Sequence, residues 1–234
     1  MSRTRLCTYD FETTGISNND HPIQIALKLV ELEGGKEVSV KEYSNYIKSP
    51  IPVPARATSI NGITDAILRE KGISPEQASK EINELINVPD TLIIGHNIIG
   101  FDNRFMNRFL PQFGYKPIDT EWSFDTAAHF KALLIGERMQ KGETFETYHK
   151  RALYTIREGI KYRLPLACSY YGIKTKESSL HNAIHDVNYT FELFKVQCQD
   201  HTNANPINKD TLDDENRVTL GFGKKERKIE AGLF

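Results

Sequence analysis

The chain has 234 residues, of which 39% are hydrophobic and 26% are charged, so the composition supports one buried core and excludes wholesale disorder. The formal net charge is −1, which excludes a protein that coats duplex nucleic acid through a large basic excess. A phosphate-binding protein with this charge must concentrate its positive charge locally or use metal ions.

The cysteines and the N-terminus favour the cytoplasm as the compartment of this protein. Cys7, Cys168 and Cys198 are widely spaced and form no CxxC motif, which argues against a disulfide framework or a zinc knuckle. The N-terminus enters a strand-like run at once, and no stretch approaches the ~18 apolar residues of a membrane span. We therefore expect a cytoplasmic protein with no membrane contact.

The first part of the chain predicts three antiparallel strands. Arg3 to Phe11 is the first, and Ile23 to Glu33 alternates well enough to be the second. The pair Gly34-Gly35 then favours a hairpin turn into a third strand over Val38 to Ile47.

Helices and two further strands follow. Asn61-Gly62 interrupts the stretch from Ala55 to Leu68, which therefore predicts short helical turns. Ser74-Pro75 begins a helix, because serine can cap it and proline suits its first turn. The remaining predicted elements are a buried strand at Thr91–Gly95, a helix at Ile98–Phe109, a strand at Trp122–Thr126, helices at Ala127–Leu134 and Leu164–Tyr171, and a last long helix within Ser179–Gln199.

This order of elements predicts an α/β protein with a mixed sheet. The segment 136–162 is charged and is expected to be partly helical. From residue 200 the composition becomes polar, so we expect one domain over residues 1–199 and a polar linker with a C-terminal tail over 200–234.

The first candidate site residues are the carboxylates Asp10 and Glu12, followed by the turn Thr13-Thr14-Gly15. Residues two apart on a strand point to the same face. Two carboxylates so close repel each other unless a cation lies between them, and hard oxygen ligands suit Mg²⁺ or Mn²⁺. The alternative is a pair of solvated acids on an ordinary strand; the turn, whose backbone can approach a nucleotide, favours the metal site.

A second candidate motif begins with His96-Asn97 and ends with Phe101-Asp102, directly after the buried strand. Asp102 is therefore expected near the carboxyl end of a central strand, where α/β sheets usually place ligands. The alternative role of Asp102 is to compensate the dipole at the start of the following helix.

A third candidate pair is His181 and Asp186. Five positions along a helix are a rotation of roughly 140°, so two helical residues at this spacing would not share a face. We therefore place His181 in the loop before the helix, where it can act as a general base, and Asp186 within the first helical turns. The alternative is a zinc site formed by His181 and His185. The sequence near them offers no further His or Cys ligand, which argues against zinc.

Together, the three motifs resemble those of the DEDDh (DnaQ-like) superfamily of 3′→5′ exonucleases. The resemblance runs from about Arg5 to Phe194 and includes the segments PIQIALKLVE and LPLACSYYGIK. It implies an RNase H-like fold with a central mixed sheet of about five strands flanked by helices. In the stretch ARATSINGITDA, Asn61 stands where histidine is common in the family.

The resemblance also implies a catalytic set. Two divalent ions, Mg²⁺ with Mn²⁺ as a substitute, would be held by Asp10, Glu12, Asp102 and Asp186, and His181 would deprotonate the attacking water. The substrate-binding residues would be Phe11, Thr13, Thr14, Ile60, Asn61, Asn97 and Phe101. Phe101 has the alternative role of a core residue.

The expected reaction is hydrolysis of single-stranded DNA from its 3′ end to nucleoside 5′-monophosphates, in proofreading or repair. A 3′→5′ exoribonuclease and a non-catalytic nucleic-acid-binding module are the alternatives. The basic segment from Arg138 to Lys161 is either a flap over the strand or a solvated helical face. The terminal Leu233-Phe234 loosely resembles peptides that dock on sliding clamps, so a clamp or polymerase is a candidate partner; packing onto the domain is the alternative.

Overall fold

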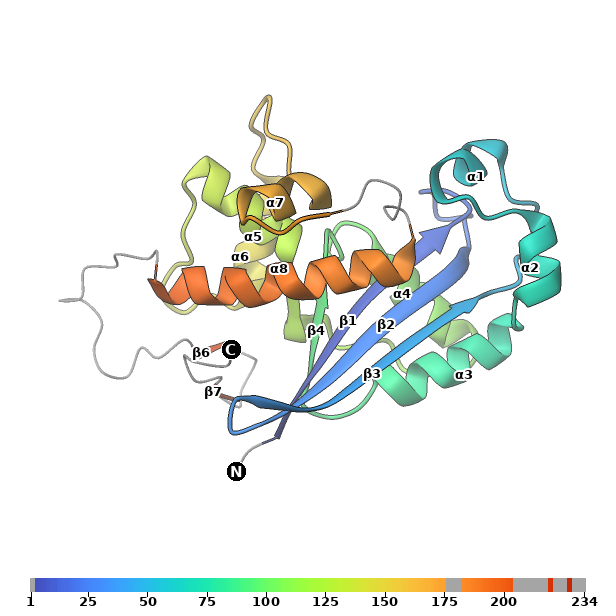
Figure 1. Cartoon of the computed structure of the whole chain (residues 1–234), viewed down its shortest axis with the longest axis horizontal. Coiled ribbons are helices and arrows are strands. Elements are labelled where there is room, and N and C mark those ends of the chain that lie inside the picture. The colour runs from blue at the N-terminus through green and yellow to red at the C-terminus, as the bar shows by residue number, and fades with distance from the viewer. Residues whose placement is uncertain (1–2, 176–181, 204–218, 221–226, 229–234) are drawn as a thin grey trace.

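A five-stranded mixed sheet with helices on both faces forms the protein (Figure 1). The structure, a computed structural model, describes residues 3–175, 182–203, 219–220 and 227–228. The strand order is β3-β2-β1-β4-β5, which confirms the predicted α/β class and the mixed sheet of about five strands. The strands are β1 (Arg3–Thr13), β2 (Pro22–Glu33), β3 (Lys36–Tyr46), β4 (Thr91–Gly95) and β5 (Ser123–Asp125).

The helices lie between and after these strands. They are α1 (Ala55–Asn61), α2 (Asp65–Lys71), α3 (Pro75–Ile86), α4 (Asp102–Gln112), α5 (Thr126–Ile135), α6 (Phe145–Tyr154), α7 (Leu164–Tyr170) and α8 (Ala183–Asn203), with a short 3₁₀ helix, η1 (Thr120–Trp122). A two-residue strand pair, β6 (Thr219–Leu220) and β7 (Arg227–Lys228), follows. None of the helices in the described residues combines the length and apolar character needed to cross a membrane.

The central strand β1 is paired on both sides. It runs antiparallel to β2 and parallel to β4. β2 and β3 form the predicted hairpin, whose turn residues Gly34 and Gly35 have φ of 58° and 79°. These left-handed conformations favour glycine, which explains why the glycine pair marks the turn correctly.

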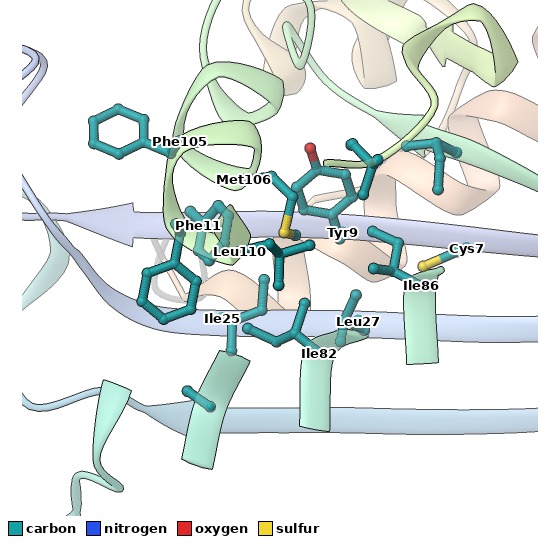
Figure 2. Packing of buried hydrophobic residues seen from close by; sticks show 14 of the residues in the cluster. Cys7, Tyr9, Phe11, Ile25, Leu27, Ile82, Ile86, Phe105, Met106 and Leu110 are labelled. Carbon is teal, nitrogen blue, oxygen red and sulfur yellow. The ribbon is translucent and has the colours of Figure 1, made fainter. Parts of the chain in front are cut away.

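One face of the sheet packs against α3 and α4 (Figure 2). Tyr9 and Phe11 of β1 meet Ile82 of α3 and Phe105 of α4 in this cluster. The opposite face carries Leu6 of β1, in a cluster with residues of α5, α6 and α8. Because side chains alternate along a strand, the even-numbered positions of β1 face the side covered by α8.

The structure confirms one predicted helix boundary and corrects another. Helical turns break at Gly62, as predicted, where the φ of 72° ends α1. The helix predicted from Ile98 begins only at Asp102, so that prediction was wrong by one turn. Asn97 has a φ of 66°, and Phe101 caps the helix with a φ of −135°, so the chain loops before α4 can begin. The predicted linker and tail lie mostly outside the described residues and stay a prediction.

Candidate active site

Three carboxylates meet where β1 approaches the start of α8. Asp10 and Glu12 are even-numbered residues of β1, so they extend the row that faces α8. Asp186 lies in the first turn of α8, as predicted. One carboxylate oxygen from each of the three residues lies within 4.8 Å of the others. Segments near opposite ends of the chain thus form one acidic cluster.

Asp102 lies beside this cluster, at the N-terminus of α4. Its Oδ1 accepts a 3.0 Å hydrogen bond from the backbone N–H of Phe11, between Asp10 and Glu12 in sequence. The pairing of β1 with β4 ends at Thr8, so β1 continues past the end of β4. Asp102 therefore satisfies a strand donor, and its side chain is only 3% exposed.

Burial and mutual repulsion raise the pKa values of these acids. Burial raises the pKa of Asp10 well above its usual range, and the charges of Asp102, Glu12 and Asp186 add to the effect. Burial and the charge of Asp186 raise the pKa of Glu12 to about 8. Burial also raises the pKa of Asp102 to about 7, against the hydrogen bond from Phe11. A cluster of this kind stores repulsion that a cation relieves.

Asn61 connects α1 to the cluster. Its side chain hydrogen-bonds to the Glu12 carboxylate, which lowers the Glu12 pKa and partly offsets the effect of burial. The Asn61 Oδ1 also accepts a 3.0 Å hydrogen bond from the backbone N–H of Ile63. The oxygen of the Asn61 amide is thus held by the turn after α1, and its NH₂ group donates to Glu12. Its neighbour Ile60 is 52% exposed.

The turn after Glu12 is closed by its own side chains. The Thr13 hydroxyl donates to the carbonyl of Gly15, and the Thr14 hydroxyl donates to Asp20. A Cβ on Gly15 would lie 2.6 Å from the Asp20 carboxylate, so a larger residue at this position would displace that side chain. The two hydroxyls predicted to contact substrate are therefore engaged within the turn.

Two arginines of α4 hold the far side of this turn. Arg104 donates a 2.7 Å hydrogen bond to the carbonyl of Ile16, and Arg108 donates to the carbonyl of Asp20. Ile16 itself is 78% exposed. The loop beside the acidic cluster is thus attached to the same helix that supplies Asp102.

The buried carboxylate of Asp125 organises the loop before Asp102. Its Oδ1 accepts hydrogen bonds from the backbone N–H of Asn97, Ala127 and Ala128, and its Oδ2 accepts one from Ile99. The sequence alone does not identify this residue as part of the site. The signal was an Asp-Thr pair between a strand and a helix, which by itself indicates only a helix cap.

The remaining predicted contacts lie in different environments. The Phe11 side chain is 4% exposed and packs edge-on against Tyr9, so it belongs to the core. Phe101 is half-buried and its ring lies 4.8 Å from that of Phe105, which supports its alternative role as a packing residue. The backbone of Asn97 is held by Asp125. His181 lies outside the described residues.

Two basic residues of the segment that was a candidate flap form ion pairs within it. α6 lies within it, and Arg151 forms ion pairs with Glu137 and Glu143. Lys150 forms a 2.7 Å ion pair with Glu146, one helical turn away. These contacts favour the reading of this part as a solvated helical face rather than a surface reserved for phosphates.

The donor set of the cluster fits a divalent metal ion. Carboxylate oxygens are hard ligands of the kind that Mg²⁺ and Mn²⁺ prefer. Three of them converge within 4.8 Å, and the charge of Asp186 adds to the effect of burial in raising the pKa of Glu12. The chemistry of these side chains therefore agrees with an ion bound by Asp10, Glu12 and Asp186.

Comparisons with known proteins agree with this geometry. The model of the RNase_T family, described as exonuclease, matches residues 7–194. The chain is 26% identical over 188 residues to the PolC-type DNA polymerase III of Ureaplasma parvum, covering 80% of this chain and 11% of that protein. It is 32% identical over 128 residues to the PolC-type enzyme of Thermotoga maritima, covering 53% and 9%. The chain thus spans about a tenth of the length of these curated relatives.

Solved structures of E. coli Exonuclease I have a similar fold. The complex with a dT13 oligonucleotide has a TM-score of 0.63 at 22% identity, with 84% of this chain and 41% of that chain covered. The zinc-bound complex with single-stranded DNA has a TM-score of 0.65 at 20% identity, with coverage of 87% and 42%. At this identity the likeness concerns the fold and confirms the RNase H-like architecture. Since the family model spans most of the chain, the protein belongs to the RNase_T exonuclease family, within the DEDDh (DnaQ-like) superfamily.

Proposed function

We propose that this protein is a metal-dependent 3′→5′ exonuclease that hydrolyses single-stranded DNA to nucleoside 5′-monophosphates. The observation that carries the proposal is the convergence of Asp10, Glu12 and Asp186 within 4.8 Å. Asp102 completes the acidic set from the N-terminus of α4. Membership of an exonuclease family supports the same reaction class.

The acidic residues are proposed to hold two divalent ions, Mg²⁺ or Mn²⁺. When bound, such ions stabilise negative charge on the phosphate and on the attacking and leaving oxygens. Asp10, Glu12 and Asp186 must be ionised to act as ligands, so their repulsion is relieved when the site is loaded. Asp102 is positioned by the Phe11 backbone to act with them.

His181 is proposed to take the proton from the attacking water. An unperturbed histidine titrates near neutral pH and can serve as a general base there. The 3′-terminal nucleotide is proposed to lie between the turn at Thr13 and Thr14 and the α1 segment that carries Ile60 and Asn61. The exposure of Ile60 supports a contact with the terminal base.

DNA is the favoured substrate. The curated relatives are DNA polymerases, and the Exonuclease I structures with a similar fold contain single-stranded DNA. A preference for RNA would require a contact to the 2′-hydroxyl. RNA is therefore the second substrate in the test.

The test uses 5′-labelled single-stranded DNA and RNA of the same sequence, with Mg²⁺, Mn²⁺ or EDTA. We expect a ladder shortening from the 3′ end of DNA, nucleoside 5′-monophosphate products, and no reaction in EDTA. A ladder on RNA alone would replace the DNase proposal with the exoribonuclease alternative. Metal-independent cleavage would contradict the proposed site.

Two variants and a matched control assign the chemistry. Asp10→Ala should abolish hydrolysis while the circular dichroism spectrum is unchanged. His181→Ala should slow single-turnover hydrolysis by about 10²-fold or more while Mn²⁺ binding is retained. The control is His185→Ala, an exposed histidine four residues along. Equal rates for His181→Ala and His185→Ala would remove His181 from the mechanism.

A protein partner is proposed to bind the C-terminal tail, outside the catalytic domain. A polymerase or a sliding clamp is proposed to contact the tail that ends in Leu233-Phe234, after the polar linker proposed to follow α8. Pull-down by a clamp should then require the last six residues. Equal recovery of the full and shortened chains would contradict the contact.

A further inference from the structure

The segment that joins α6 to α7, residues 155–163, projects beyond these helices (Figure 1). It turns at Gly159, whose φ is 75°. Most of its side chains are exposed, and Ile156 is 91% exposed, the most of the large apolar side chains in the described residues. Tyr154, at the end of α6, is 71% exposed. Apolar and aromatic side chains gathered on one exposed segment indicate a binding surface.

Two side chains hold the ends of this projecting segment. The buried Lys131 of α5 donates a 2.6 Å hydrogen bond to the carbonyl of Leu153, and its Nζ lies 5.2 Å from the centre of the Tyr162 ring. His96, directly after β4, donates a 2.9 Å hydrogen bond from Nε2 to the carbonyl of Tyr162. The ends of the segment are therefore fixed, while its turn faces solvent.

The projecting segment and α7 lie beside the acidic cluster. His96 is followed by Asn97, which begins the loop that leads to Asp102. Burial raises the pKa of the Cys168 thiol of α7 to about 12, and the charge of Asp186 adds to the effect, so α7 lies near the cluster. A strand whose 3′ end lies in the cluster thus has this surface next to it.

Positive charge is concentrated on the same surface. Residues 154–174 include four basic residues and one acidic residue, in a chain whose net charge is −1. Arg157, Lys161 and Arg163 are exposed. In the part of the chain that the structure describes, none of these three forms an ion pair, unlike the basic residues of α6. The surface therefore has the local positive charge that phosphates attract.

Tyr170 adds an aromatic ring to these charges. It is 59% exposed, and with Arg163 and Leu166 it follows the i, i+3, i+7 spacing of one helical face. The centre of its ring lies 5.2 Å from that of Phe130 and 5.1 Å from that of Tyr171, so the ring is supported by its neighbours. A supported and partly exposed aromatic ring can stack with a base.

We propose that the projecting segment and the exposed face of α7 bind single-stranded DNA upstream of its 3′ end. Arg157, Lys161 and Arg163 contact phosphates, and Tyr170 stacks with a base. This role rests on the proposed function, because the strand that is bound here is the one whose 3′ end reaches the acidic cluster. A single strand fits this surface because it offers both phosphates and unpaired bases.

Binding of labelled oligo(dT) in EDTA tests this surface apart from catalysis. Fluorescence anisotropy compares strands of about 4 and about 16 nucleotides, of which the longer extends well beyond the acidic cluster. Arg157→Ala/Lys161→Ala should raise the Kd of the longer strand about tenfold and reduce the slope of log Kd against log salt by about 1.4, the value for two phosphate contacts. An equal effect on both strands would show a general effect of charge and would overturn the proposal.

Lys80→Ala/Lys116→Ala is the matched control. It removes two exposed lysines, from α3 and from the loop after α4, on the face of the sheet opposite to α7 and α8. The Kd of the longer strand should then stay within about twofold of the wild-type value. Equal losses in both double variants would overturn the proposal, and so would a wild-type Kd for Arg157→Ala/Lys161→Ala, which would leave the surface to a protein partner.

Substitution of Tyr170 tests the stacking. Tyr170→Ala should raise the Kd of the longer strand about fivefold or more with no change in the salt slope, whereas Tyr170→Phe, which keeps the ring, should stay within about twofold of wild type. Thermal unfolding checks that both variants are folded. Equal Kd values for the two variants would remove stacking from the proposal.

Binding and hydrolysis together separate this surface from the proposed reaction. If the longer strand binds through these residues but is not hydrolysed in Mg²⁺, the proposed reaction is overturned and the surface is retained. If the strand is hydrolysed but binds Arg157→Ala/Lys161→Ala as it binds the wild type, the surface is overturned and the reaction is retained.

Discussion

The backbone N–H of Phe11 donates a 3.0 Å hydrogen bond to the carboxylate of Asp102, a residue 91 positions away. This bond attaches the N-terminus of α4 to the strand that carries Asp10 and Glu12. The acidic residues of two motifs are thus positioned relative to one another by a backbone contact.

Asp102→Asn separates the two roles of this residue. The amide oxygen keeps the acceptor for Phe11, but the negative charge is lost, so the fold should be retained while the rate of hydrolysis falls by about 10²- to 10³-fold. Single-turnover hydrolysis and thermal unfolding measure the two effects. The control is Glu84→Gln, the same change at an exposed position of α3. A wild-type rate for Asp102→Asn would show that its charge is not required.

The stability of the metal-free protein should fall as pH rises. The folded-state pKa of Glu12 is about 8, against an ordinary value of 4.5, so the folded protein holds a proton that the unfolded chain releases. The contribution of Glu12 therefore lowers the free energy of unfolding increasingly between about pH 4.5 and 8, and this loss is constant above pH 8. Saturating Mg²⁺ should accordingly raise the Tm more at about pH 8 than at about pH 5.

Glu12→Gln is the variant for this measurement. It should flatten the dependence of Tm on pH over the same window and reduce the stabilisation by Mg²⁺, whereas Glu84→Gln should leave both unchanged. Calorimetry in EDTA and in Mg²⁺ gives the two curves. A wild-type pH dependence for Glu12→Gln would assign the effect to other groups.

Asp125→Asn should loosen the loop that leads to Asp102. The amide oxygen can still accept from Asn97, but the amide nitrogen then faces the N–H of Ile99, which loses its acceptor. An unsatisfied buried donor costs about 1–3 kcal/mol, which denaturant unfolding detects. Asp119→Asn is the control, since the exposed Asp119 accepts one hydrogen bond from Glu121. Equal losses of stability in both variants would contradict the special role of Asp125.

Asn61→Ala should weaken the response to metal at neutral pH. Without the amide donor the pKa of Glu12 rises further, so fewer molecules have the ionised ligand. We expect the Mg²⁺ concentration for half-maximal activity to rise by about tenfold at pH 7, and by less at pH 9. Ser59→Ala, on the same helix, is the control. A shift that is equal at both pH values would separate Asn61 from the ionisation of Glu12.

The sequence predicted the mixed α/β sheet and the positions of the acidic residues on their elements because these signals are local. Alternation in β1 predicts which side Asp10 and Glu12 face, and the position of Asp186 follows from helical geometry. The start of α4 was not predictable in the same way. Ile98 and Ile99 look helical, but Asp125, far away in sequence, binds the backbone of Asn97 and Ile99 and imposes a loop. A long-range contact through one carboxylate leaves no periodic signal.

Because side chains alternate along β1, the acidic site depends on the number of residues in this strand. Deleting one residue between Leu6 and Asp10 would turn both carboxylates toward α3 and α4 and bring Phe11 to the side of α8. An insertion in the hairpin at Gly34-Gly35 would only lengthen an exposed turn. A shift of one residue within this strand therefore exchanges the side chains of the acidic face with those of the core.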